Sequence, residues 1–131
     1  AAVANDGVLM HPYIATGTVD PEGRQALTVG PSVYSRVMSP ATARKINAMM
    51  QRVVDEGTGT AAALEGIQVA GKTGTAERNV KKNIAQPWFI AFAPANDPRV
   101  AVAVTLEEVV GGFGGVDAAP IARAVMESLL R

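Results

Sequence analysis

Two neighbouring extended segments constrain the fold more than any other part of the sequence. Pro87–Pro94 is a continuous apolar run of a length typical of a strand that is buried on both faces. Val100–Glu107 instead alternates larger apolar residues with small ones, as expected of a strand with different residues on its two faces. Because the turn-forming Asn96–Pro98 lies between them, we predict an antiparallel hairpin.

The sequence predicts a helix and a third strand before this hairpin. Ser39 is suited to cap a helix that begins at Pro40, and apolar residues recur at helical spacing until Glu56–Gly57. Ile67–Thr73 is predicted to be the third strand. Nearer the N-terminus the signals are short. We expect extended pieces at 8–10 and 13–15 and a turn at 20–23.

A second helix is predicted after the hairpin. Asp117 is expected to be its N-cap, with Pro120 in the first turn, where proline is tolerated. The small side chains of Ala101 and Ala103 are expected to let this helix pack closely on their face of the sheet. The residues expected to form its apolar stripe are Ile121, Ala122, Val125, Met126 and Leu129. The predicted fold is therefore α+β, with a three-stranded antiparallel sheet packed by helices.

Composition narrows the class of partner. The 131 residues include 12 basic and 12 acidic side chains and no cysteine. This balance does not favour nucleic acid as a partner, and the absence of cysteine excludes disulfides and thiolate metal sites. We expect no metal and no other cofactor.

The tetrapeptide Lys72–Thr75 carries the clearest chemical signal. Lys-Thr-Gly-Thr combines a cation, two hydroxyls and a residue without Cβ, which suits an anion held against the backbone. On a strand, Thr73 and Thr75 point to one face and can donate hydrogen bonds to a carboxylate, while Lys72 must reach round the strand edge. Gly74 is expected to leave the backbone open, so that a substrate chain can lie beside the strand.

The Lys-Thr-Gly element belongs to a motif set whose other members are absent here. In penicillin-binding proteins and serine β-lactamases it accompanies Ser-x-x-Lys, which carries the nucleophile, and a second Ser/Asn element. No serine of this chain has a lysine three residues later; the serines are Ser32, Ser35, Ser39 and Ser128. The chain therefore holds at most part of such an active site.

The N-terminal residues indicate a piece of something larger. Ala1–Gly7 reads as the last turn of a helix closed by Gly7, but it is too short to nucleate a helix alone. We expect residues 1–131 to be the C-terminal segment of a single domain whose upstream part lies outside this chain.

A series of short segments resembles, in order, the C-terminal part of the transpeptidase domain of class B penicillin-binding proteins. The resemblance covers nearly the whole chain and is greatest to the actinobacterial penicillin-binding protein A type. The segments that carry it are Asn5–Tyr13, Gly57–Thr60, Ala70–Glu77, Trp88–Pro94 and Ala119–Ala122.

This resemblance implies a peptidoglycan D,D-transpeptidase that forms a serine acyl-enzyme and is acylated by β-lactams. The implied partners are stem peptides ending in D-Ala-D-Ala, β-lactams and the upstream part of the same domain. It also implies that Lys72 and Thr75 are catalytic, that the N–H of Thr75 contributes to the oxyanion hole, and that Lys72–Thr75 bind substrate. The parent protein would be anchored by an N-terminal helix at the outer face of the cell membrane, and this segment alone would be inactive.

Two other functions compete with this interpretation. Gly66–Thr73 satisfies the pattern Gly-x-x-x-x-Gly-Lys-Thr of a P-loop NTPase, although a P-loop should follow a strand and open a helix. The chain could also be a non-catalytic scaffold module that keeps the fold without the chemistry. Only the upstream sequence distinguishes that module from the enzyme.

The remaining candidates favour structural roles. His11, the sole histidine, is expected to lie in a surface loop, and Glu107–Glu108 is expected to be a strand end. Trp88, Phe89 and Phe92 are predicted to be core residues.

Overall fold

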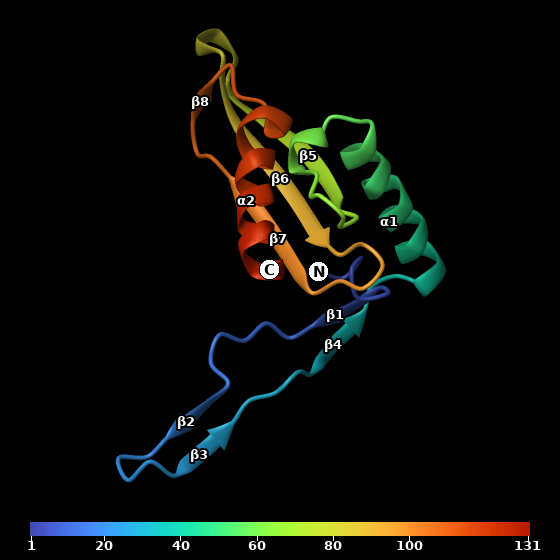
Figure 1. Ribbon diagram of the computed structural model, residues 1–131. Coiled ribbons are helices and arrows are strands. Elements are labelled where there is room, and N and C mark those ends of the chain that lie inside the picture. The colour runs from blue at the N-terminus through green and yellow to red at the C-terminus, as the bar shows by residue number, and fades with distance from the viewer.

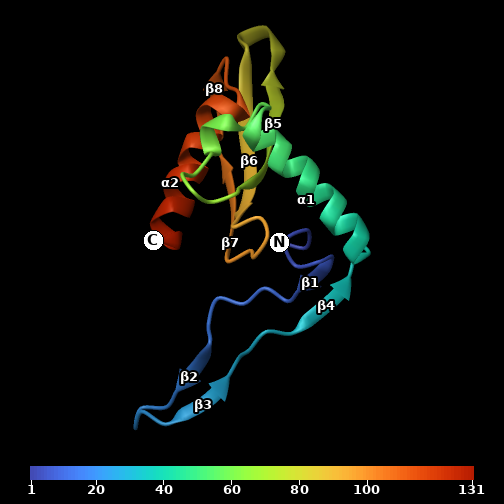
Figure 2. The same ribbon diagram turned by 45° about the vertical axis from the view of Figure 1, so that its right-hand side comes forward.

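The computed structural model describes residues 1–131, which form a body of sheet and helices and a projecting arm (Figure 1). The sheet of the body is antiparallel and four-stranded, in the order β5-β6-β7, with β8 also paired to β6. Figures 1 and 2 show α2 across one face of this sheet and α1 beside its β5 edge. The elements of the body are α1 (Pro40–Asp55), β5 (Ala70–Asn79), β6 (Ile84–Ala93), β7 (Val100–Thr105), β8 (Val109–Val110) and α2 (Ala119–Leu130).

Three short helical turns connect these elements. Two are 3-10 turns, η1 (Thr60–Ala62) and η2 (Val80–Lys82), and η3 (Gly114–Ala118) is a π-helical turn that leads into α2. The α+β prediction is confirmed. The predicted strand count was too low by one, because the two residues of β8 are too few to show a periodic pattern.

The arm consists of two successive two-stranded ribbons that extend away from the body (Figure 2). The predicted strand at residues 8–10 is confirmed, but residues 13–15 form no strand, and β2, β3 and β4 were missed. Their mostly polar or exposed residues show no clear alternation. The strands are β1 (Val8–Met10), β2 (Gly17–Val19), β3 (Gln25–Thr28) and β4 (Val33–Arg36).

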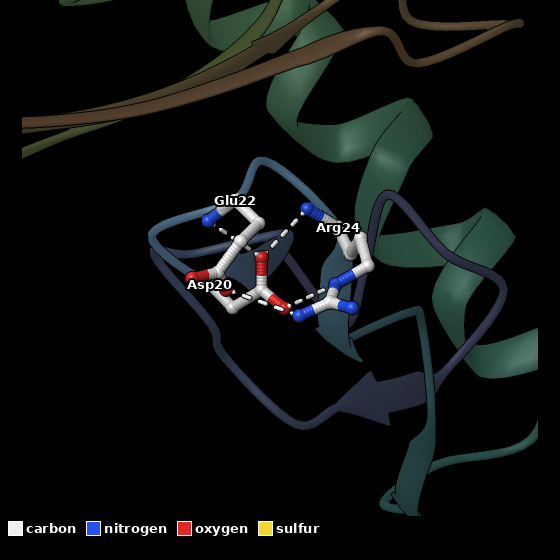
Figure 3. A network of polar contacts seen from close by, with 3 residues as sticks. All are labelled: Asp20, Glu22 and Arg24. Atoms are coloured by element: carbon white, nitrogen blue, oxygen red, sulfur yellow. Dashed lines mark hydrogen bonds and ion pairs between the residues drawn. The ribbon is translucent and has the colours of Figure 1, made fainter.

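The tip of the arm is closed by the carboxylate of Asp20, as predicted for a turn at 20–23 (Figure 3). This carboxylate accepts hydrogen bonds from the backbone N–H of Arg24 at 2.8 Å, the Arg24 Nε at 2.8 Å and the backbone N–H of Glu22 at 3.1 Å. These contacts, above all the one from the Arg24 N–H, hold the pKa of Asp20 below its ordinary value.

The start and end of α1 follow the sequence prediction. The Ser39 hydroxyl accepts a hydrogen bond from the N–H of Thr42 at 3.1 Å, and Pro40 occupies the first turn. The helix ends at Asp55, and the N–H of Glu56 still donates to the carbonyl of Arg52. The expected turn at Ala1–Gly7 also forms, with Gly7 at a φ of +84° that favours glycine.

The main core lies between α2 and the sheet, around Phe89 and Met126. β6 was predicted to be buried on both faces, which holds for Ala91–Ala93, but Trp88 and Ile90 remain 39% and 47% exposed. Trp88 is therefore not a core residue, whereas Phe89 and Phe92 are buried as predicted. The prediction failed at Trp88 and Ile90, because α2 covers only the face that carries Phe89.

The packing of α2 on β7 also differs from the prediction. Ala101 and Ala103 are exposed, and the face toward the helix is formed instead by Val100, Val102 and Val104. The pairing of Val104 with Phe89 places these larger side chains on the core face, where they bury more apolar area. On α2, the fully buried residues are Ala119, Ala122 and Met126, while Ile121, Val125 and Leu129 are exposed.

Two element boundaries were also predicted wrongly. Asp117 does not cap α2, because its carboxylate accepts a hydrogen bond from the N–H of Phe113 at 2.6 Å within the preceding turn. β5 begins three residues later than predicted and continues to Asn79 instead of ending at Thr73. Its polar second half pairs with β6 as far as Ile84, a partner that a single-strand pattern does not reveal.

Neither helix of the fold has the length and hydropathy that a membrane crossing requires.

Candidate functional site

The Lys-Thr-Gly-Thr segment lies on the outermost strand of the sheet. β5 pairs only with β6, so its other edge has no strand partner, and α1 packs near the start of the strand, where a Cβ at Gly71 would lie 3.1 Å from Val54. Lys72 lies opposite Ile90, and Gly74 lies opposite Trp88. An extended peptide could therefore add to this free edge by backbone hydrogen bonding.

The side chain of Lys72 curls back over the strand edge. Its Nζ donates a hydrogen bond of 2.7 Å to the carbonyl oxygen of Thr73 and lies 3.4 Å from the Thr73 hydroxyl. The expected reach of Lys72 round the edge is confirmed. The ammonium and the hydroxyl are thus close enough to bind the same anion.

Thr73 and Thr75 share one face of β5, as strand parity predicted, and each hydroxyl has a partner on a different loop. The Thr73 hydroxyl is 2.8 Å from the hydroxyl of Thr58, in the connector after α1. The Thr75 hydroxyl accepts a hydrogen bond of 3.3 Å from the N–H of Gly114, in η3. Both threonines are therefore held from outside their own strand.

The backbone of Gly74 is covered on one side. A Cβ at Gly114 would clash with the carbonyl oxygens of Gly74 and Trp88, so only glycine lets η3 come this close. A Cβ at Gly74 would lie 3.2 Å from the Cβ of Trp88. The expected openness of Gly74 is thus confined to the free edge of β5.

Sequence reasoning missed Thr58 and Gly114 as members of this site. Gly57–Thr60 carried part of the family resemblance, but neither it nor the glycine-rich segment 111–115 was assigned to the site. Nothing in one sequence shows that residues 15 and 39 positions away from Thr73 and Thr75 contact them. The repeated glycines were the available signal, since glycine permits close backbone approach.

The other candidate residues lie away from the site. His11 is exposed in the arm, as expected, with its ring edge-on to Tyr34 at a centroid distance of 5.0 Å. Glu107 and Glu108 are exposed after the end of β7. No group of three or more His, Asp or Glu side chains is placed to hold a metal ion.

The P-loop alternative is excluded by the local structure. Lys72 and Thr73 lie within β5, which continues as a strand to Asn79. A P-loop instead opens a helix at this lysine, so that backbone N–H groups converge on the phosphates. The match of Gly66–Thr73 to that pattern is fortuitous.

Comparison with known protein families identifies the family of the chain. The sequence model of one protein family, described as the penicillin-binding protein transpeptidase domain, matches residues 1–127. The chain belongs to the penicillin-binding protein transpeptidase family. The resemblance of the ordered segments is thereby confirmed.

Relatives within the penicillin-binding proteins are similar over almost the whole chain. The peptidoglycan D,D-transpeptidase PbpA of Mycolicibacterium smegmatis is 40% identical over 100% of this chain and 28% of its own length. The ceftriaxone acyl-enzyme complex of penicillin-binding protein A from M. tuberculosis is 36% identical, with a TM-score of 0.91 over 99% of this chain and 30% of that one.

A third similar structure is the D,D-transpeptidase domain of a peptidoglycan glycosyltransferase from Eggerthella lenta. It is 40% identical, with a TM-score of 0.87 over 98% of this chain and 30% of that one. The chain therefore spans less than a third of the length of each of these three relatives.

Proposed function

We propose that residues 1–131 are the C-terminal segment of the transpeptidase domain of a peptidoglycan D,D-transpeptidase, and that they supply its substrate-binding strand. The observation that carries this proposal is the convergence of the Lys72 ammonium and the Thr73 hydroxyl at the free edge of β5. A peptide substrate that ends in a carboxylate is suited by hydrogen-bond donors of this kind beside an open strand edge. Relatives that are D,D-transpeptidases support the same assignment.

The residues of the strand would act at two places on the substrate. Lys72, Thr73 and Thr75 would bind the terminal carboxylate of D-Ala-D-Ala through one charge-assisted contact and two hydroxyl donors. The backbone N–H of Thr75 would stabilise the oxyanion together with the N–H of the nucleophile. Gly74 would keep a side chain away from the peptide between these points.

The reaction would proceed by acyl transfer. A serine outside residues 1–131 would attack the carbonyl of the penultimate D-alanine, and the bond to the terminal D-alanine would break, with a proton transferred to its amine. An amine of a neighbouring stem peptide would then attack the ester and release the serine. A β-lactam would acylate the same serine, as the ceftriaxone acyl-enzyme of the M. tuberculosis relative illustrates.

The proposed substrate also sets the location and partners. Because peptidoglycan lies outside the cytoplasmic membrane, the domain would act on the extracytoplasmic face, held there by an N-terminal helix. Its partners would be stem peptides, β-lactams and the upstream part of the same domain, with no nucleic acid. A role in cell shape or cell division would follow from cross-linking the wall.

Labelled penicillin tests the proposal. The intact protein that contains this chain should form a covalent adduct on a serine outside residues 1–131, located by mass spectrometry. Unlabelled β-lactam should compete with the label. A folded intact protein that forms no adduct would contradict the transpeptidase assignment and favour a non-catalytic scaffold module.

A further inference from the structure

The connector between α1 and η1 places one hydroxyl against the substrate-binding strand. The Thr58 hydroxyl oxygen lies 2.8 Å from that of Thr73, and this is the contact that the Thr58 side chain makes within the fold. We infer that Thr58 is a positioning residue that directs the Thr73 hydroxyl toward the substrate carboxylate. This role rests on the proposed function.

The hydrogen-bonding capacity of Thr73 gives the contact its direction. A hydroxyl has one hydrogen to donate and two lone pairs that accept. The Lys72 ammonium can only donate, so where it contacts the Thr73 oxygen it occupies a lone pair. If Thr58 donates to the second lone pair, the one hydrogen of Thr73 is left for the carboxylate.

Such a chain of donors strengthens the final contact. A hydroxyl that accepts a hydrogen bond becomes a better donor, because successive bonds polarise one another. Thr58 would therefore act on the carboxylate without touching it. It would also prevent Thr73 from rotating into a rotamer that turns its hydrogen away.

The neighbouring backbone fixes the position of Thr58. A Cβ at Gly57 would lie 2.9 Å from the Val53 carbonyl oxygen, and a Cβ at Gly59 would lie 3.1 Å from the Phe89 ring. A Cβ at Gly115 would clash with the carbonyl oxygen of Thr58 itself. These contacts pack the flanking glycines and the Thr58 carbonyl, while the exposed Thr58 side chain reaches Thr73 on β5.

The N–H of Gly59 adds a further constraint, since it donates a hydrogen bond of 2.9 Å to the carbonyl of Val53 in α1. The connector is thus tied to the end of a helix. A loop residue whose neighbour is tied to a helix in this way is better placed to orient another side chain than one on a free loop.

Paired ligands test this role in the intact protein. The second-order rate of acylation is measured with a β-lactam that bears its free carboxylate and with the neutral methyl ester of the same compound. Thr58→Val should lower the rate with the acid about fivefold, the effect of one lost hydrogen bond. The same variant should react with the ester at close to the wild-type rate, because the neutral ester cannot accept a charge-assisted hydrogen bond from the Thr73 hydroxyl.

Two matched variants complete the experiment. Thr58→Ser keeps the hydroxyl and should restore the wild-type rate with the acid. Thr60→Val makes the same chemical change two residues along the connector, where no hydrogen bond is lost, and should have no effect. An equal loss with acid and ester, or a Thr58→Ser rate as low as that of Thr58→Val, would show a purely structural role and overturn the inference.

Failure of the inference can be told from failure of the proposed function. If Thr58→Val reacts with the acid at the wild-type rate while the wild type is readily acylated, only the role of Thr58 is overturned. If the wild type is acylated by neither ligand, the transpeptidase assignment falls, and the inference falls with it.

Discussion

The backbone N–H of Gly114 donates a hydrogen bond of 3.3 Å to the hydroxyl of Thr75. This contact joins the turn before α2 to the strand that carries the Lys-Thr-Gly-Thr segment. Because the Thr75 oxygen accepts, its hydroxyl hydrogen remains available to an acceptor outside the chain. The glycine-rich segment therefore orients the Thr75 hydroxyl, which we propose binds substrate, as well as connecting two elements.

Close packing at Gly115 should be sensitive to a single added methyl group. Gly115→Ala would place a Cβ against the carbonyl oxygen of Thr58, so η3 or the connector must move. We expect the free energy of unfolding of the domain to fall by about 1–3 kcal/mol, as for overpacked sites, and the acylation rate to fall with it. Thermal unfolding and labelled penicillin measure the two effects.

Gly30→Ala is the matched control, because a Cβ there meets no atom within 4 Å. It should leave both the melting temperature and acylation unchanged. If Gly115→Ala behaved like Gly30→Ala, the tight contact between η3 and the connector would be wrong.

The buried face of α2 can be tested by comparing two large apolar residues. Met126 is fully buried against the sheet, whereas Leu129 is 57% exposed. Met126→Ala should lower the free energy of unfolding by about 2–5 kcal/mol, and Leu129→Ala by much less. Denaturant unfolding monitored by circular dichroism would measure both. Equal losses would indicate that α2 is rotated from the orientation described here.

This comparison also shows what the sequence could and could not predict. The helical period correctly identified α2, but the choice of face depended on which residues lie nearest the sheet. Ala119 and Ala122 are buried because their small side chains let the helix approach, while Ile121 and Val125 lie outside the contact. An apolar stripe in the sequence favours the larger residues. It therefore wrongly predicts that Ile121, Val125 and Leu129 face the sheet.

At the site, the sequence predicted the strand but not its supports. Strand parity placed Thr73 and Thr75 on one face and Lys72 at the edge, and the structure agrees. Thr58 and Gly114 could not be found in this way, because tertiary packing brings them to β5. Local periodicity contains no information about such long-range contacts.

The cap of α1 should contribute to stability without contributing to chemistry. Ser39→Ala removes the acceptor for the Thr42 N–H and should lower the free energy of unfolding by about 1 kcal/mol. Ser39→Asp keeps an acceptor and should retain most of this energy. Both variants of the intact protein should form the penicillin adduct normally. Loss of the adduct in both would point to Ser39 as the nucleophile and contradict our assignment.

The tip of the arm should respond to pH only under acidic conditions. The pKa of Asp20 is lowered, chiefly by the Arg24 N–H, so the closed tip binds a proton less tightly than the open chain does. The contribution of the Asp20 carboxylate to the stability of the tip is therefore fully present above the ordinary Asp pKa of about 3.9. It is lost as the pH falls through the lower pKa that Asp20 has in the closed tip. NMR titration of the Arg24 amide would follow this loss.

Two variants identify the group that titrates. Asp20→Asn should abolish the change at the Arg24 amide, whereas Glu22→Gln should preserve it, because the Glu22 carboxylate contacts only the Arg24 guanidinium, at 3.0 Å. A titration that persisted in Asp20→Asn would assign the change to another group.

Lys72 provides the most direct test of the proposed substrate-binding role of β5. In the intact protein, Lys72→Ala would remove a charge-assisted contact to the substrate carboxylate, worth about 1.5–3 kcal/mol. The second-order rate of penicillin acylation should then fall about ten- to a hundredfold, and further if Lys72 also takes part in proton transfer. The melting temperature should remain near that of the wild type, because the side chain is exposed.

Lys82→Ala, in the exposed turn after β5, removes the same charge away from the site and should react normally. If the Lys72→Ala protein were acylated at the wild-type rate, this segment would not be the carboxylate site, and the functional assignment that rests on it would fail.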